Sequence, residues 1–172
     1  MTRYVALLRG VNVGGVTIKM ADLADVVRGL GYDDVKTVLA SGNVLLSTNH
    51  SAATITTNLQ NALRERFGYQ AWVQVLTAEG VARIVADYPF ERGRDGWHDY
   101  AIFVVDPGVK DELLGVELDP ETERTAAGDG VVYWTVPKGS TLDSRIGKAT
   151  GAARLKPSIT TRNLNTLEKL SS

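Results

Sequence analysis

The chain has 172 residues, of which 44% are hydrophobic and 23% charged, a composition typical of folded globular proteins rather than disordered ones. Nineteen basic and twenty acidic residues leave a formal net charge of -1, so the chain as a whole has no bulk attraction for nucleic acid or anionic lipid. The absence of cysteine and the presence of only two histidines exclude disulfides, cysteine zinc sites and iron–sulfur clusters, and we expect no metal or other cofactor. No apolar run approaches the roughly 20 residues of a membrane helix, so we expect a cytoplasmic protein without membrane association.

Periodicity predicts the order β-α-β-β-α-β for residues 1–77. Short apolar or alternating runs predict strands at residues 3–9, 35–39, 44–47 and 70–76. Apolar residues at helical spacing predict a helix near 23–30, ended by Gly31. A second helix, marked by Ile55, Leu59, Leu63 and Phe67, is expected to be capped near Ser51 and ended by Gly68. This order is that of a ferredoxin-like subdomain, an antiparallel sheet with both helices on one face.

Residues 78–172 start a second series of elements. A helix capped by Thr77 is expected through Tyr88, followed by a strand at 100–105, a helix at 110–118, strands near 124 and at 131–136, and helical segments near 142–150 and 161–170. We therefore predict a second small α+β, plait-like subdomain with a basic C-terminal helical tail. The predicted fold class is α+β, with two ferredoxin-like (α/β-plait) subdomains packed together.

Charge is unevenly distributed along the chain. Residues 138–172 contain seven basic side chains and two acidic ones, whereas the rest of the chain is acidic. The basic segment either folds onto the acidic stretch 106–129 or forms an anion-binding face. We favour the first interpretation, because charge runs usually mark a solvated surface.

A glycine-rich stretch follows the first predicted strand. Gly10 and Gly15 have the spacing of a nucleotide-binding P-loop, but Val16 stands where that motif needs its lysine, and Lys19 comes too late, which excludes the motif. Backbone N–H groups flanked by Arg9 and Lys19 remain as a candidate nest for a phosphate or carboxylate. The alternative is a connection that needs glycine for its backbone geometry alone.

Three further polar segments are candidates for ligand contacts. The segment 41–43 is expected at a hairpin tip, where Ser41 lacks the context of a nucleophile but can supply a polar contact. Lys138 and Arg145 offer an anion contact, or else Thr141 or Asp143 caps the helix that follows. In the segment 160–170, Arg162, Asn165, Thr166 and Lys169 would share one side of a helix capped by Thr160 or Thr161. They either pin the tail to neighbouring loops or bind a ligand.

Four sequence blocks resemble the bacterial family known as domain of unknown function 1697. They are ALLRGVNVGG (6–15) with Lys19-Met20, VKTVLASGNV (35–44), PKG (137–139) with Ser144-Arg145-Ile146, and TTRNLNTLEKL (160–170). The last block differs from the family pattern at Leu164, where tryptophan is usual, and the Ser144-Arg145-Ile146 triplet also departs from it. The resemblance implies two ferredoxin-like subdomains and brings no established activity, substrate or catalytic residue.

The family motifs coincide with the polar segments described above, which suggests one shared site. Its candidate residues are Arg9, Gly10, Asn12, Gly14, Gly15, Lys19, Ser41, Gly42, Asn43, Ser144, Arg145, Arg162, Asn163, Asn165 and Thr166. The leading hypothesis is a binding module for a phosphate-bearing or other anionic ligand, nucleotides and nucleic acid included. Its cleft would be lined by residues 10–19, 41–43 and 160–166. The alternatives are a metal-independent transferase or hydrolase that uses the same cleft, and a structural or oligomerisation protein whose polar motifs pin the subdomains together. The oligomeric state stays open.

Overall fold

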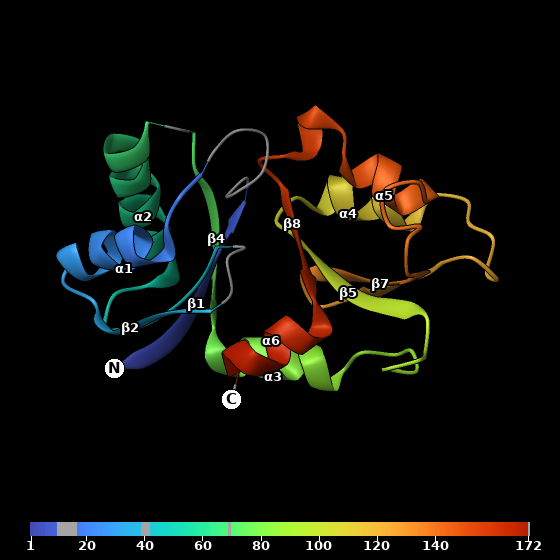
Figure 1. The fold of residues 1–172 in the computed structure, drawn as a ribbon, viewed down its shortest axis with the longest axis horizontal. Helices are drawn as coiled ribbons and strands as arrows, with labels where there is room; N and C mark the ends of the chain where they lie inside the picture. Colours follow the sequence, from blue (N-terminus) through green and yellow to red (C-terminus); the bar gives the residue numbers. More distant parts are fainter. Residues whose placement is uncertain (10–16, 39–41, 69, 172) are drawn as a thin grey trace. The chain divides into compact units, whose positions relative to one another are not determined.

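The computed structural model describes residues 1–9, 17–38, 42–68 and 70–171, and the chain divides into two compact units (Figure 1). Unit 1 comprises Met1–Ala82 with Lys169–Ser172, and unit 2 comprises Arg83–Glu168. Each unit contains one four-stranded antiparallel sheet. The predicted fold class, α+β with two ferredoxin-like subdomains, is therefore confirmed.

Unit 1 has the predicted order of elements. They are β1 (Thr2–Arg9), α1 (Met20–Gly29), β2 (Asp33–Val38), β3 (Asn43–Thr48), α2 (Ala52–Phe67), β4 (Trp72–Thr77) and the start of α3 (Ala78–Ala86). The sheet order β2-β3-β1-β4 places the first and third strands at the centre, as the ferredoxin-like topology requires. Helices α1 and α2 lie on the same face of this sheet (Figure 1).

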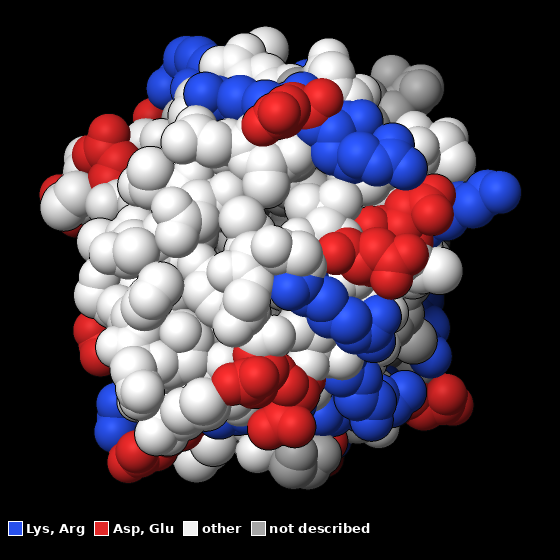
Figure 2. All heavy atoms as spheres, turned by 90° about the vertical axis from the view of Figure 1, so that its left-hand side faces the viewer, with Lys and Arg blue, Asp and Glu red and all other residues white. Residues whose placement is uncertain are grey.

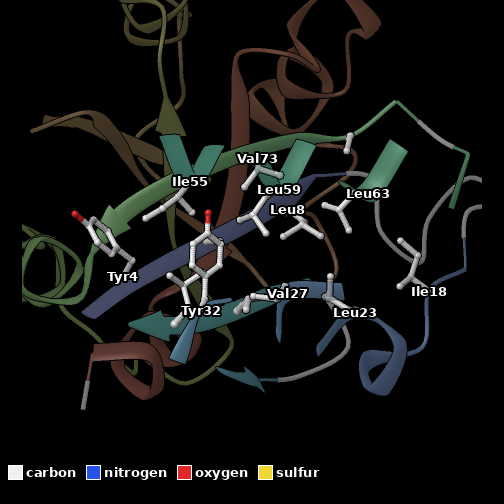
Figure 3. Close-up of a cluster of buried hydrophobic side chains, with 14 residues drawn as sticks. Tyr4, Leu8, Ile18, Leu23, Val27, Tyr32, Ile55, Leu59, Leu63 and Val73 are labelled. Atoms are coloured by element: carbon white, nitrogen blue, oxygen red, sulfur yellow. The ribbon is translucent and has the colours of Figure 1, made fainter. Parts of the chain in front are cut away.

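The core of unit 1 lies between the sheet and these two helices (Figure 3). Leu8 of β1 and Val73 of β4 point towards Leu59 of α2, and all three are buried. Ile18 is 3% exposed and belongs to the same cluster, although it precedes α1. Its burial fixes the point at which the chain enters α1, because an apolar side chain in the core anchors the backbone beside it.

The local signals at helix ends act as expected. Ser51 Oγ accepts a hydrogen bond from the Thr54 N–H at 3.2 Å, and Thr77 Oγ1 accepts one from the Gly80 N–H at 3.0 Å. Gly68 follows α2 with a φ of 68°, a left-handed conformation in which glycine avoids a side-chain clash. These predictions are confirmed because each depends only on neighbouring residues.

Unit 2 repeats the topology of unit 1. Its elements are the end of α3, β5 (Trp97–Val104), α4 (Pro107–Leu114), β6 (Arg124–Gly128), β7 (Val131–Pro137), α5 (Arg145–Thr150), the 3₁₀ turn η1 (Ala153–Leu155), β8 (Ile159–Asn163) and α6 (Leu164–Ser171), whose end belongs to unit 1. The sheet order is β6-β7-β5-β8, again with the first and third strands of the unit at the centre. Ile102, Trp134 and Ile159 form its core with apolar residues of α4 and α5.

The predicted helix over residues 161–170 is wrong at its start. Residues 159–163 are the edge strand β8, which pairs with β5 so that Tyr100 lies opposite Asn163 and Val104 opposite Ile159. The helix begins only at Leu164. Local spacing favours a helix here, but the partner strand is some 60 residues away in sequence and its hydrogen bonds decide the outcome. The proposed caps Thr160 and Thr161 are therefore strand residues.

The basic C-terminal segment contacts the acidic stretch, as the favoured interpretation of the charge distribution predicts. Arg154 Nη1 donates to Glu112 Oε2 at 3.0 Å, and Arg145 Nη1 donates to the Glu117 carbonyl at 3.0 Å. Among the described residues, no group of three or more histidine, aspartate or glutamate side chains could hold a metal ion. None of the described helices has the length and apolarity needed to cross a bilayer.

Candidate functional site

One end of the unit 1 sheet gathers several predicted site residues. Arg9 is the last residue of β1 and lies opposite Trp72, the first residue of β4. Two residues earlier, Leu7 lies opposite Asn43 of β3 on one side and Gln74 of β4 on the other. Since alternate residues of a strand share a face, the side chains of Arg9, Asn43 and Gln74 project from the face opposite α1 and α2.

The backbone at this end is fixed by the neighbouring strands. Gly42 accepts a hydrogen bond from the Leu8 N–H at 2.9 Å and has a φ of 82°, a conformation that favours glycine. Asn43 is fully buried, and its Nδ2 donates to the Val38 carbonyl at 2.9 Å across the β2–β3 hairpin. Asn43 therefore has a structural role in closing the hairpin, whatever its remaining amide atoms contact.

Arg9 is the charged residue of this group. Its side chain is partly buried, and desolvation lowers the pKa of the guanidinium from its usual value. A partly desolvated cation interacts more strongly with an anion than an exposed one does, because less water screens the interaction. Arg9 is thus the residue of this cluster best placed to attract a negative charge.

The remaining predicted residues of unit 1 are divided between described and undescribed parts of the chain. Lys19 is exposed and directly precedes α1, where its carbonyl accepts the Leu23 N–H at 3.0 Å. The predictions for Gly10, Asn12, Gly14, Gly15 and Ser41 lie outside the described residues. The structure therefore brings together Arg9, Gly42 and Asn43, and it adds Trp72 and Gln74 beside them.

In unit 2, Ser144 and Arg145 begin a helix. Ser144 Oγ accepts the Gly147 N–H at 3.0 Å and donates to the Thr141 carbonyl at 2.9 Å, so Ser144 is the N-cap of α5 in place of the expected Thr141 or Asp143. The Arg145 N–H donates to Glu123 Oε2 at 2.8 Å. Both predicted residues thus make contacts that hold α5 in place.

Glu123, which the sequence analysis did not single out, is the centre of this arrangement. Its carboxylate is 3% exposed and accepts three hydrogen bonds, from the N–H groups of Arg145 and Ile146 and from Trp134 Nε1. An anionic carboxylate at a helix N-terminus satisfies backbone donors that have no partner within the helix. No local sequence signal distinguishes Glu123 from the other acidic residues nearby, since its partners come from β7 and α5.

The predicted residues of the last block lie at the junction of β8 and α6. Arg162 is 7% exposed, and its Nη1 donates to Thr160 Oγ1 at 2.7 Å and to the Thr161 carbonyl at 3.0 Å. Asn163 Oδ1 accepts the Asn165 N–H at 2.8 Å and so caps α6. Asn165 Oδ1 in turn accepts a 3.3 Å hydrogen bond from Arg92 Nη2.

A second buried polar group, also missed from the sequence, lies on the opposite face of the unit 2 sheet from α4 and α5. Asp99 is 9% exposed and accepts the Tyr88 O–H at 2.7 Å and the Gly93 N–H at 3.0 Å. Burial, followed by the hydrogen bond to Asp99, raises the pKa of the Tyr88 hydroxyl well above its usual value. Tyr88 therefore stays protonated at neutral pH and acts as a donor to Asp99.

The fold and sequence blocks together define the class of protein. Residues 1–133 match the model of the family described as protein of unknown function DUF1697, and the chain belongs to this family. The blocks at 137–139, 144–146 and 160–170 lie beyond the matched residues.

One solved structure extends the comparison over nearly the whole chain. It is the conserved bacterial protein SP0830 from Streptococcus pneumoniae, which is 24% identical and aligns with a TM-score of 0.83 over 99% of this chain and 97% of that one. At this identity the likeness concerns the fold alone. The comparison with curated proteins found no match.

Proposed function

We propose that this protein is a binding module for a small phosphate-bearing or other anionic ligand, with Arg9 at the end of β1 as its principal contact. The observation that carries the proposal is the partial burial of the Arg9 guanidinium on the sheet face it shares with Asn43. A charge-assisted hydrogen bond to such a cation is about twice as strong as a neutral one.

The residues around Arg9 supply the other elements of an anion site. Gly10, Asn12, Gly14 and Gly15 follow Arg9 directly in sequence, and glycine-rich backbone offers N–H donors to oxyanions. Lys19 carries an exposed cation at the start of α1. The neighbouring Gln74, which is partly exposed, is a neutral group that can orient a ligand without competing for its charge.

The charge of the whole chain favours a small anion over nucleic acid. Figure 2 shows Lys and Arg interspersed with Asp and Glu around a broad uncharged area, with no continuous basic stripe on that face. Nucleic-acid binding usually requires several phosphate contacts from clustered cations. With a formal net charge of -1, the chain does not have the basic excess typical of such proteins.

The proposal is tested by thermal shift and calorimetric titration with inorganic phosphate, nucleotides, phosphosugars and short RNA and DNA at low and high salt. A ligand present at about 100 times its Kd adds about 2.7 kcal/mol of stability, and each kcal/mol raises Tm by roughly 2–4 °C at this chain length. We expect a salt-sensitive shift of this size with a small phosphate-bearing compound and a clear reduction of the shift in Arg9→Gln.

Arg28→Gln is the matched control, because Arg28 is exposed and makes only long contacts, a 3.5 Å surface pair with Asp25 and a 3.4 Å hydrogen bond to the Val35 carbonyl. Ligand binding should survive in this variant. If Arg9→Gln folds and binds every ligand as the parent protein does, the proposed site is wrong.

A structural role is the better-supported proposal for the polar blocks of unit 2. Ser144, Asn163 and the Arg145 backbone make capping contacts within the unit. Hydrogen bonds of this kind stabilise helix ends and leave those atoms unavailable to a ligand. The ligand contacts of the proposed binding module are therefore assigned to the Arg9 site and not to these capping residues.

A further inference from the structure

The loop between α3 and β5 carries two arginines in contrasting environments. Arg92 is paired: its Nη1 and Nη2 donate to the two carboxylate oxygens of Glu168, each at 3.1 Å. Arg94, two residues later, has no acidic partner among the described residues. The loop therefore presents one guanidinium paired with a carboxylate and one without a carboxylate contact among the described residues.

Stacking holds Arg94 in position. Its Cζ lies 4.0 Å from the centroid of the Trp97 ring, and its Nη2 makes a long hydrogen bond of 3.4 Å to Thr135 Oγ1. Its Nε–H is buried without an acceptor in the described part of the chain. A guanidinium lying on an aromatic ring has lost much of its side-chain freedom already, so binding a ligand there costs less entropy.

Asp99 is close to Arg94 but does not neutralise it through a direct contact. The carboxylate accepts from Tyr88, Gly93 and, at 3.5 Å, Thr135 Oγ1, and it is buried by these partners. Its acceptor sites are thus largely occupied. Arg94, by contrast, retains two N–H donors on Nη1 for which the described structure provides no protein acceptor.

A second cation is located at the same end of the sheet. Trp97 and Pro137 are paired across β5 and β7, and the Lys138 N–H donates to the Gly96 carbonyl at 2.8 Å. The Lys138 side chain is exposed. The lysine ammonium therefore extends from backbone that adjoins the loop carrying Arg94.

We propose that Arg94, held over the Trp97 ring and assisted by Lys138, forms an oxyanion-binding site in unit 2 that accepts a phosphate group. The planar guanidinium matches two phosphate oxygens, and Lys138 adds a point charge. This site is separate from the Arg9 site of unit 1 and does not depend on it. The variants Arg9→Gln and Arg94→Gln distinguish the two sites, because each removes the cation of one site alone.

The test is a titration of the full chain with inorganic phosphate. Binding is monitored through the ¹H–¹⁵N resonances of the arginine side chains and through tryptophan fluorescence. Chloride at matched ionic strength is the reference. We expect saturable shifts of the Arg94 resonances with phosphate and not with chloride. Arg94→Gln should weaken phosphate binding at this site by about tenfold, the size of effect expected for loss of charge-assisted hydrogen bonds.

Arg92→Gln is the matched control, since it removes a guanidinium from the same loop that is already neutralised by Glu168. It should leave the affinity of the Arg94 site within about twofold, as should Arg9→Gln in unit 1. Trp97→Leu keeps the cation but removes the stacking and should weaken binding. Unsaturable shifts, equal shifts with chloride, or unchanged affinity in Arg94→Gln would each overturn the proposal. If Arg94→Gln does not fold, Trp97→Leu and Lys138→Gln decide it by the same criterion.

Discussion

Some residues of this protein act through partners close by in the sequence, whereas others act through partners far along the chain. Ser51 and Ser144 cap helices by contacts within three residues, so capping rules identify such positions or place them within a residue or two. Glu123 satisfies the start of α5 from more than twenty residues away. Its role cannot be deduced from neighbouring residues, because the carboxylate and its donors meet only after β6 and β7 pair.

Gly147 shows a steric requirement of the same helix. A Cβ added there would overlap the Thr141 carbonyl oxygen and would lie 2.8 Å from Ser144 Oγ, the cap itself. Gly147→Ala must therefore displace the capping turn, and we expect it to lower the free energy of unfolding by about 1–3 kcal/mol or more. Urea denaturation monitored by circular dichroism measures the change.

Gly151→Ala is the control for this substitution. Gly151 has a φ of -76°, and an added Cβ would only come within 3.4 Å of the Gly147 carbonyl oxygen. Its effect should stay within about 1 kcal/mol in either direction. Equal losses for the two alanine variants would show that the Thr141 contact is not what demands glycine at 147.

At the scale of elements, the central strand β1 is apolar on both faces along Val5–Leu8. Leu8 faces α1 and α2, whereas Leu7 faces the other way, yet their side chains are 1% and 0% exposed. An antiparallel sheet covered by helices on one face often exposes its second face to water, with alternating polar residues. The continuous apolar run Val5–Leu8 predicts instead that both faces are buried.

Substitution of these two adjacent leucines tests how much burial on each face of β1 contributes to the free energy of unfolding. Leu7→Ala and Leu8→Ala should each reduce the free energy of unfolding by about 2–5 kcal/mol, because both remove buried methyl groups from packed surroundings. Chemical denaturation of the two variants gives the comparison. A loss below about 1 kcal/mol for Leu7→Ala alone would mean that the second face is solvated in solution.

The strand β8 is the element that sequence periodicity assigned incorrectly. Its residues Thr160 and Arg162 are buried on one face while Ile159 joins the core of the unit on the other. From residue 160 to Asn163, the spacing of polar residues fits a helix as well as it fits a strand. The strand is favoured over the helix because its pairing supplies hydrogen-bond partners to backbone groups along one edge of β5.

For the whole molecule, two copies of one topology carry different chemistry. Both units have the order β-α-β-β-α-β with the first and third strands central, but α2 has 16 residues whereas α5 has six. Unit 2 also contains buried side-chain hydrogen bonds, in which Glu123 and Asp99 are acceptors and Tyr133 is a donor. The stability of unit 2 should therefore depend on the protonation of Tyr133, whose pKa burial raises.

Tyr133 makes this dependence measurable at high pH. Its hydroxyl donates to the Ile84 carbonyl at 2.6 Å, and burial raises its pKa to about 12, above the ordinary value of about 10. The folded state thus binds this proton more tightly than the unfolded state does. The associated stability is complete below about pH 10 and is lost as the pH rises towards 12.

We expect Tyr133→Phe to lose stability at neutral pH, by about 1 kcal/mol, and to show a shallower decline between pH 10 and 12. Urea denaturation at pH 8 and at several values up to 11.5 measures both effects. Tyr88, whose pKa is also raised, should retain part of the alkaline decline in this variant. An unchanged slope would indicate that Tyr133 does not titrate with the folding transition.

The sequence by itself determined the features of this protein that depend on near neighbours. Helix caps at Ser51 and Thr77, the helix stop at Gly68, the element order of unit 1 and the absence of cysteine chemistry all follow from local patterns and composition. The same is true of the placement of Arg9 at a strand end, directly before a glycine-rich segment.

Tertiary structure alone decided the features that join distant segments. It made residues 159–163 a strand and placed the Glu123 carboxylate at the start of α5. It also placed Arg94 over the Trp97 ring, near an Asp99 carboxylate that already accepts a hydrogen bond from Tyr88. The physical reason is that a buried polar group forms its hydrogen bond with whichever donor or acceptor the fold brings within about 3 Å. Spacing along the chain carries no information about that distance.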